Sequence, residues 1–329
     1  MCTALTLETN EGNHLFGRNV DMDNPEMKNV LVIPRNYVYL TNVTNQENRI
    51  KYALIGLGLM IGKTPILADG LNEKGLVCAV LDLPCHGEWN QEIIKEKVNL
   101  SPCEVTSWLL SNCASIDDVI TALKNLNIVS MPINPHVEVA SIHWMVTDTT
   151  GKSIVIEKVK GKLRVYHNKV GVLTNEPAFD WHLTNLNLYL KADPNQPRDQ
   201  KWGQQSLKAF SQGFGSIGIP GDFSSPSRFV KAAFLRDHAV VGLTHESAIS
   251  EMFHILNAVA MVKGAVITEQ GKDYFTQCST CMCQEKGIYY YNTYNNNQIN
   301  AIHLFEQDLE SQEVKILPLQ DKLAIHLQK

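Results

Sequence analysis

Strand-like segments follow one another in blocks along this chain, and helix-like segments form blocks of their own. Alternating apolar and polar residues predict a meander of three strands over residues 142–148, 153–159 and 163–167. Further strands are predicted over residues 288–304, and helices over residues 226–238 and 246–262. Because strands that occur in blocks pair with antiparallel neighbours, this order favours an α+β fold with antiparallel sheets over a doubly wound parallel sheet.

Two further helices have recognisable start signals. Ser101 is followed by Pro102 and, three residues on, by Glu104, a combination typical of a capping box with a first-turn proline. Ser115 opens a second helix, which we expect to run to Leu123. Both signals are local, so they fix where these helices begin.

No feature of the sequence divides its 329 residues into separate parts. There is no Pro/Gly/Ser-rich linker, charge block or internal repeat, and 44% of the residues are hydrophobic. We therefore expect one domain over residues 1–329. The net charge is −5 with the two signs interspersed, which argues against nucleic acid or an acidic membrane as a partner.

Targeting signals are not evident either. The first twenty residues lack a basic start and an apolar core, and no apolar run approaches the roughly eighteen residues of a membrane-spanning helix. The eight cysteines have scattered spacings, which suggests reduced thiols. These features predict a cytoplasmic protein.

Two motifs that could indicate a bound cofactor or metal are better explained as ordinary loop and strand segments. The segment from Gly213 to Gly218 matches G-x-G-x-x-G, but Pro220 and Gly221 follow, so a helix is not expected to start there. Cys278 and Cys281 have metal-ligand spacing, yet no second Cys/His pair matches them, and the alternation fits a strand. We expect no metal and no cofactor.

Cysteine stands directly behind the initiator methionine. Removal of Met1 would place a thiol and a free α-amine on one residue, Cys2. An α-amine is partly unprotonated near neutral pH, and an adjacent base makes a thiol a stronger nucleophile. Cys2 is thus a candidate nucleophile that carries its own base, although Cys2 alone could also be an ordinary small residue at a strand start.

The next segment, residues 5–21, reads as a hairpin with a polar turn. A turn centred on Glu11 and Gly12 would place Asp21 directly opposite Cys2, within about 5.5 Å between Cα atoms. In that register Arg18 falls on the other face, so a bulge or strand end would be needed to bring it near the thiol. The alternative for Arg18 and Asp21 is a surface ion pair.

Blocks spread over almost the whole chain resemble the choloylglycine hydrolase family, which contains conjugated bile salt hydrolases and penicillin V acylases. The resemblance rests on the start Met-Cys-Thr and on residues 16–21, 33–37, 68–76, 171–175, 219–223, 227–229 and 287–294. It implies an N-terminal nucleophile hydrolase that cleaves a linear amide of a small-molecule substrate. It also implies a four-layer αββα sandwich, two antiparallel sheets between helical layers, and a homo-oligomer, a tetramer in the family.

The resemblance also implies roles for individual residues. Cys2 would be the nucleophile and Asp21 the partner of its amine. Arg18 would flank the thiol and favour the thiolate, because a cation beside a thiol stabilises its charged form. Asn175 would donate to the oxyanion, and Arg228 would complete the polar network around the cysteine.

Position 82 departs from the family pattern. Bile salt hydrolases usually have asparagine there and many penicillin V acylases have tyrosine, whereas this chain has Asp82. An ionised carboxylate cannot donate to an oxyanion, and its charge opposes a leaving group that bears an acid. Asp82 would have to be protonated by burial, be turned away, or serve a different substrate.

By the same resemblance, residues 56–67 border the acyl pocket, with other walls from residues 22–27 and 129–139. The residues expected to bind substrate are Asp82, Met22, Leu59, Met60, Ile61 and Ile66. Lys63-Thr64 before Pro65 replaces the Asp-Tyr often found in bile salt hydrolases, which, together with Asp82, favours a penicillin V acylase. The alternatives are a bile salt hydrolase, an N-acyl homoserine lactone acylase, and a protein that binds an amphipathic ligand without cleaving it.

Overall fold

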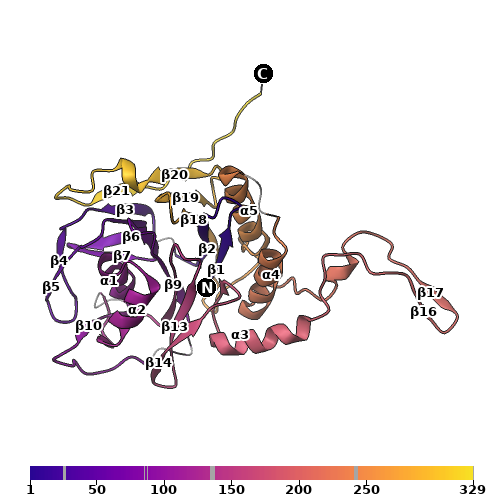
Figure 1. Ribbon diagram of the computed structural model, residues 1–329, viewed down its shortest axis with the longest axis horizontal. Helices are drawn as coiled ribbons and strands as arrows, with labels where there is room; N and C mark the ends of the chain where they lie inside the picture. Colours follow the sequence, from indigo (N-terminus) through magenta and orange to yellow (C-terminus); the bar gives the residue numbers. More distant parts are fainter. Residues whose placement is uncertain (25–26, 85, 87, 134–137, 241–243, 329) are drawn as a thin grey trace.

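The computed structural model describes residues 1–24, 27–84, 86, 88–133, 138–240 and 244–328. Two antiparallel sheets face one another and are covered on their outer sides by helices (Figure 1). Helices α4 (Ser225–Asp237) and α5 (His245–Ala258) cover the first sheet. Helices α1 (Val105–Asn112) and α2 (Ile116–Leu123) lie on the outer side of the second. This is the four-layer αββα arrangement predicted from the family resemblance.

The first sheet has six strands and contains the N-terminus. In spatial order they are β15 (Val172–Leu173), β1 (Cys2–Glu8), β2 (His14–Met22), β18 (Phe275–Cys283), β19 (Ile288–Thr293) and β20 (Asn300–His303). Strand β1 therefore pairs with β15 on one side and β2 on the other.

The second sheet has nine strands. Eight follow in the order β14 (Lys162–His167), β13 (Ser153–Val159), β12 (Ile142–Thr147), β9 (Val77–Asp82), β8 (Asp69–Asn72), β6 (Leu54–Ile61), β3 (Asn29–Ile33) and β21 (Lys315–Pro318). Strand β7 (Thr64–Leu67) pairs with β6 outside this path. The N-terminus lies where the two sheets face one another, next to β9 (Figure 1).

The remaining elements lie around these layers. They are α3 (Phe179–Leu186) and three two-stranded pairs: β4 (Val38–Leu40) with β5 (Glu47–Arg49), β10 (Val98–Leu100) with β11 (Leu126–Ile128), and β16 (Gln200–Trp202) with β17 (Gln205–Leu207). The β16–β17 pair stands at the end of an arm that projects from the body of the molecule (Figure 1). None of the helices in the described part of the chain has the length and apolar character needed to cross a bilayer.

Apolar side chains fill the spaces between the layers in two clusters. The inner cluster joins both sheets and the helices α4 and α5, with Phe16, Leu57 and Met252 fully buried. The outer cluster lies between the second sheet and α1 and α2, around Leu109 and Trp144. Both faces of the central strands are therefore buried, which holds their alternate side chains in fixed positions.

Local predictions from the sequence are confirmed. Ser101 and Glu104 form the capping box, and Ser115 caps α2 by accepting from the Asp118 amide at 3.2 Å. The predicted meander appears as β12, β13 and β14. Cys278 and Cys281 lie on β18. The glycine motif from Gly213 to Gly218 forms only a short 3₁₀ turn, so no α-helix starts there.

The predicted register of the first hairpin is wrong by one residue. Cys2 pairs with Val20, because the loop is centred on Glu11 and is closed by the Thr9 amide, which donates to the Asn13 carbonyl at 2.9 Å. Asp21 therefore lies opposite Met1, where its amide donates to the Met1 carbonyl at 3.1 Å. Arg18 pairs with Ala4 and shares the face of Cys2, so no bulge is needed to bring it to the thiol.

Candidate active site

The Cys2 thiol is held against a buried cation at the start of β1. Cys2 is 5% exposed, and Nη2 of Arg18 donates to its Sγ at 2.9 Å. Nη1 of Arg18 donates to the Ala68 carbonyl at 2.6 Å, which ties this side chain to the second sheet. A fixed positive charge therefore lies in direct contact with the sulfur of the candidate nucleophile.

A buried carboxylate in turn holds Arg18. Oδ2 of Asp69 lies 3.7 Å from Nε of Arg18, and both side chains are almost completely buried. Tyr289 and Thr280 donate to this carboxylate at 2.6 and 3.0 Å. Burial raises the pKa of Asp69, and Arg18 opposes that shift. Burial lowers the pKa of Arg18, but Cys2 and Asp69 shift it upward overall, so the cation persists. The sequence had shown Asp69 only as part of a family block, with no role assigned.

The other described cysteines lack the environment of a nucleophile. Burial raises the pKa of each: Cys103 to about 11, Cys78 and Cys113 to about 12, and Cys278, Cys281 and Cys283 upward as well. These thiols stay protonated at neutral pH. Cys278 is the closest comparison, because it pairs with Val20 and so shares the face of Cys2.

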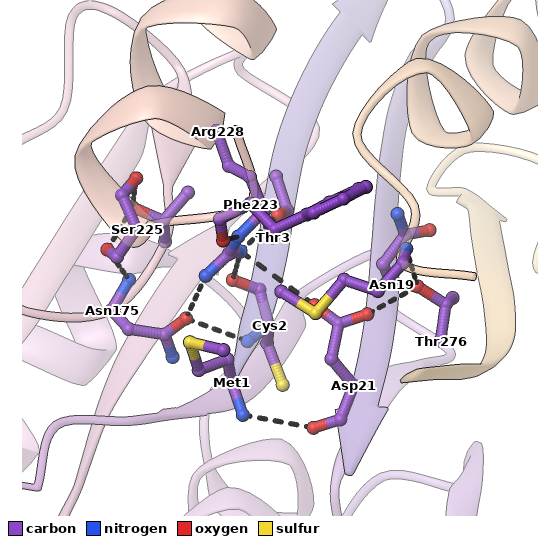
Figure 2. A network of polar contacts seen from close by, with 12 residues as sticks. Met1, Cys2, Thr3, Asn19, Asp21, Asn175, Phe223, Ser225, Arg228 and Thr276 are labelled. Carbon is purple, nitrogen blue, oxygen red and sulfur yellow. Dashed lines mark hydrogen bonds and ion pairs between the residues drawn. The ribbon is translucent and has the colours of Figure 1, made fainter. Parts of the chain in front are cut away.

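Asn175 contacts the backbone nitrogen of the nucleophile. Its Oδ1 accepts from the Cys2 amide at 2.9 Å and from Nη2 of Arg228 at 2.8 Å (Figure 2). Both partners can only donate, so they fix which end of the side-chain amide is oxygen. Its Nδ2 donates to the Asp82 carbonyl at 2.8 Å, which leaves the second N–H of that nitrogen for another acceptor.

Arg228, from α4, connects the first residues of β1 to the carboxylate of Asp21. Its Nη1 donates to the Cys2 carbonyl and to Oγ1 of Thr3, both at 2.6 Å (Figure 2). The same nitrogen lies 3.8 Å from Oδ2 of Asp21. Thr276 donates to Oδ1 of Asp21 at 2.6 Å, while Oδ2 has no hydrogen-bond donor among the described residues although it is buried. Burial raises the pKa of Asp21, and Arg228 opposes that shift.

Asp82 binds the chain terminus. Its Oδ2 lies 2.8 Å from the Met1 ammonium, which also donates to the Asp21 carbonyl at 3.0 Å (Figure 2 shows the second contact). The hydroxyl of Tyr274 lies 3.5 Å from the same carboxylate oxygen. The Asp82 side chain is 50% exposed. Of the three possibilities considered for Asp82, the structure rules out burial and shows the carboxylate turned toward an amine beside the nucleophile.

The apolar residues expected to bind substrate do not all share one face. Leu59 pairs with Ile66 and, like Ile61, continues the face of β6 that carries Leu57 into the inner cluster. Met60 points the other way and packs against the outer cluster, because side chains alternate along a strand. Met60 therefore lies on the opposite face of β6 from Leu59 and Ile61.

The remaining predicted wall consists of segments that the structure describes only in part. Met22, at the end of β2, packs half-buried against the inner cluster. Residues 25–26 and 134–137 of the predicted walls lie outside the described residues. A cavity of about 600 Å³ opens nearby, lined among others by Met27, Phe275 and Cys278, but Cys2 is not among its lining residues.

A second buried pair supports the Asn175 segment, and sequence reasoning missed it. Nδ1 of His143 lies 2.8 Å from Glu157, and its Nε2 lies 3.0 Å from the Thr174 carbonyl. Glu157 also accepts from the Phe179 amide. The pair therefore clamps the backbone on both sides of Asn175. Its only sequence signal was the polar His and Glu within otherwise apolar strands.

Known proteins are similar to this chain over its full length. Residues 2–317 match the family of linear amide C–N hydrolases called the choloylglycine hydrolase family. A bile salt hydrolase/transferase of Clostridium perfringens is 46% identical over 99% of both chains. A crystal structure of the conjugated bile acid hydrolase from Clostridium perfringens superimposes with a TM-score of 0.94, at 45% identity over 100% of both chains.

Penicillin V acylases are more distant. The enzyme of Pectobacterium atrosepticum is 30% identical over 50% of this chain and 39% of its own length. The structure of the Agrobacterium tumefaciens enzyme has a TM-score of 0.77 at 21% identity, covering 96% of this chain and 91% of its own, which shows a shared fold. The comparisons thus favour the bile salt hydrolase alternative over the penicillin V acylase prediction.

Proposed function

Because this chain belongs to the choloylglycine hydrolase family and is a linear amide C–N hydrolase with an N-terminal cysteine, we propose that it deconjugates bile-acid amides. The observation that carries this proposal is the Cys2 thiol held at 2.9 Å by the buried Arg18, in a chain that aligns end to end with bile salt hydrolases. The small-molecule substrate would be a steroid acid joined to an amine through a linear amide.

The proposed reaction uses the residues in the following order. With Met1 removed, the α-amine of Cys2 takes the thiol proton, and the thiolate bonds to the substrate carbonyl carbon. The C–N bond then breaks as the leaving nitrogen takes the proton, and water cleaves the resulting thioester. Arg18 stabilises the thiolate, and the spare N–H of Asn175 is available for the oxyanion.

Asp21 and Arg228 would hold the amine and the strand in place during this reaction. The buried Oδ2 of Asp21 has no hydrogen-bond donor among the described residues, so it can accept from the ammonium form of the Cys2 amine. Arg228 grips the Cys2 carbonyl at 2.6 Å. These contacts support the roles that the resemblance implied for both residues.

The proposal of a steroid acyl group is supported by the apolar face that Leu59, Ile61 and Ile66 form together with Met22. We expect cholylglycine to be cleaved with a kcat/KM at least about tenfold higher than phenoxyacetylglycine or hexanoylglycine, because the steroid buries more apolar area. All three amides release glycine, so differences in initial rate report the acyl group alone. Faster cleavage of phenoxyacetylglycine would instead support a penicillin V acylase, and faster cleavage of hexanoylglycine a fatty-acyl specificity.

Assembly and location belong to the same proposal. The arm and its base expose Leu190, Trp202 and Phe210 by 82%, 73% and 90%, which supports a homo-oligomer, a tetramer by resemblance. We expect Trp202→Lys with Phe210→Lys to shift sedimentation equilibrium to smaller species, while Ile325→Lys in the C-terminal tail does not. An unchanged mass of the double variant would exclude the arm as the contact.

A cytoplasmic location is supported by the described cysteines, which are all free thiols.

A further inference from the structure

The Met1 ammonium is seated in a small site formed by the ends of two strands. Asp82, the last residue of β9, provides a carboxylate oxygen at 2.8 Å, and Asp21, near the end of β2, provides a carbonyl oxygen at 3.0 Å. An ammonium has three N–H donors and no acceptor, so two acceptor oxygens, one of them charged, are the chemistry that recognises it.

This ammonium site is adjacent to the nucleophile and separate from the site of the Cys2 nitrogen. Met1 and Cys2 are consecutive, so their Cα atoms are about 3.8 Å apart. The nitrogen of Cys2 is bound by Oδ1 of Asn175, whereas the nitrogen of Met1 is bound by Asp82 and Asp21. After removal of Met1, the Cys2 amine therefore still has Oδ1 of Asn175 as an acceptor. The Asp82 carboxylate oxygen and the Asp21 carbonyl oxygen become free to bind another ammonium.

The charge of Asp82 is not neutralised by a side chain. Within the described residues the only cationic partner of the Asp82 carboxylate is the Met1 ammonium. The other polar contact of this carboxylate is with the hydroxyl of Tyr274 at 3.5 Å. Asp23, two residues after Asp21, is paired with Lys272 at 3.7 Å. Once Met1 is removed, the half-exposed carboxylate of Asp82 keeps no cationic partner among the described residues, next to the position that precedes Cys2.

We propose that Asp82 and the Asp21 carbonyl form a leaving-group subsite for a positively charged amine in the mature enzyme. The preferred substrates are then amides whose amine part carries a second, protonated amino group, and amides of glycine or taurine are disfavoured by repulsion from Asp82. This inference rests on the proposed amide hydrolysis and specifies the substrate class on its amine side.

The test keeps the acyl group constant and varies only the charge of the amine. Cholyl amides of ethylenediamine, glycinamide and glycine present a cationic, a neutral and an anionic leaving group of similar size. We expect Asp82→Asn to lower the ratio of kcat/KM for the cationic amide over the anionic amide by about tenfold, a value that allows for the half-exposed position. The ratio of the wild type should fall with added salt. Intact mass must show that Met1 has been removed from every sample.

Asp117→Asn is the matched control, because it removes the same charge from an exposed residue of α2, in the outer helical layer. Its ratio should equal that of the wild type. Equal ratios for Asp82→Asn and wild type would overturn the subsite and restrict Asp82 to binding the terminus of the unprocessed chain. The neutral amide tests the proposed function separately: if the wild type does not cleave it, amide hydrolysis fails, and if it is cleaved without any charge preference, only the subsite fails.

Discussion

Replacement of Cys2 by alanine is expected to reduce kcat for amide cleavage by about 10⁴-fold or more, as removal of the attacking atom does in other covalent hydrolases. Cys2→Ser should also be severely impaired, because a hydroxyl is far less ionised than a thiol. The fold should persist, since Cys2 contributes only a small side chain to the inner cluster. Its loss leaves one N–H of the buried Arg18 without a partner, so we expect a modest decrease in Tm.

The measurement is the initial rate on cholylglycine and its glycinamide analogue, together with a thermal melt. Cys278→Ala is the matched control, because Cys278 is buried on the same face of the sheet and burial raises the pKa of its thiol. This control should retain turnover and should still form an adduct with a thiol reagent at Cys2. Near-normal turnover by Cys2→Ala would end the N-terminal nucleophile assignment.

An N-terminal extension is expected to abolish activity for as long as it remains attached. In the chain that retains Met1, the Cys2 nitrogen is an amide whose N–H is donated to Asn175, so it has no basic lone pair. Loss of a general base alone costs about 10²- to 10⁴-fold in rate. The Met1 terminus is 31% exposed, so an extension can reach solvent without displacing β1.

This prediction is checked with one protein in two states. The extension would end in the recognition sequence of a protease that cuts directly before Cys2, and turnover on cholylglycinamide would be measured before and after cleavage. We expect activity only after cleavage, in proportion to the fraction of chains that begin with Cys2 by intact mass. Full activity with the extension still attached would show that the base lies elsewhere.

Local signals in the sequence were sufficient for many elements of the fold. The capping box at Ser101 and the cap at Ser115 depend on residues three positions apart, so the start of the 3₁₀ turn that leads into α1 and the start of α2 could be predicted from the chain alone. The strands of the meander were predictable for the same reason, because alternation is a property of neighbouring residues.

The register of the first hairpin could not be predicted in this way. It depends on which hydrogen bonds close the loop, and the bond from Thr9 to Asn13 centres the turn on Glu11. A shift of one residue exchanges the two faces of a strand, which is why Arg18 was expected on the wrong side of β2. The same alternation of faces separates Met60 from Leu59 and Ile61 on β6, although all three were predicted to line one pocket.

The sequence alone identifies the nucleophile. When Met1 is removed, Cys2 becomes the first residue, so its own free α-amine can act as the base for its thiol. What surrounds the nucleophile was decided by tertiary structure. Asn175 is 173 residues away from Cys2, and the partner that holds Arg18, Asp69, comes from the opposite sheet. Buried charges require partners, and the sheets bring those partners together from distant parts of the chain, so no local pattern marks them. The half-exposed carboxylate of Asp82 is the same kind of case: its residue type was evident from the sequence, and its contact with an ammonium was not.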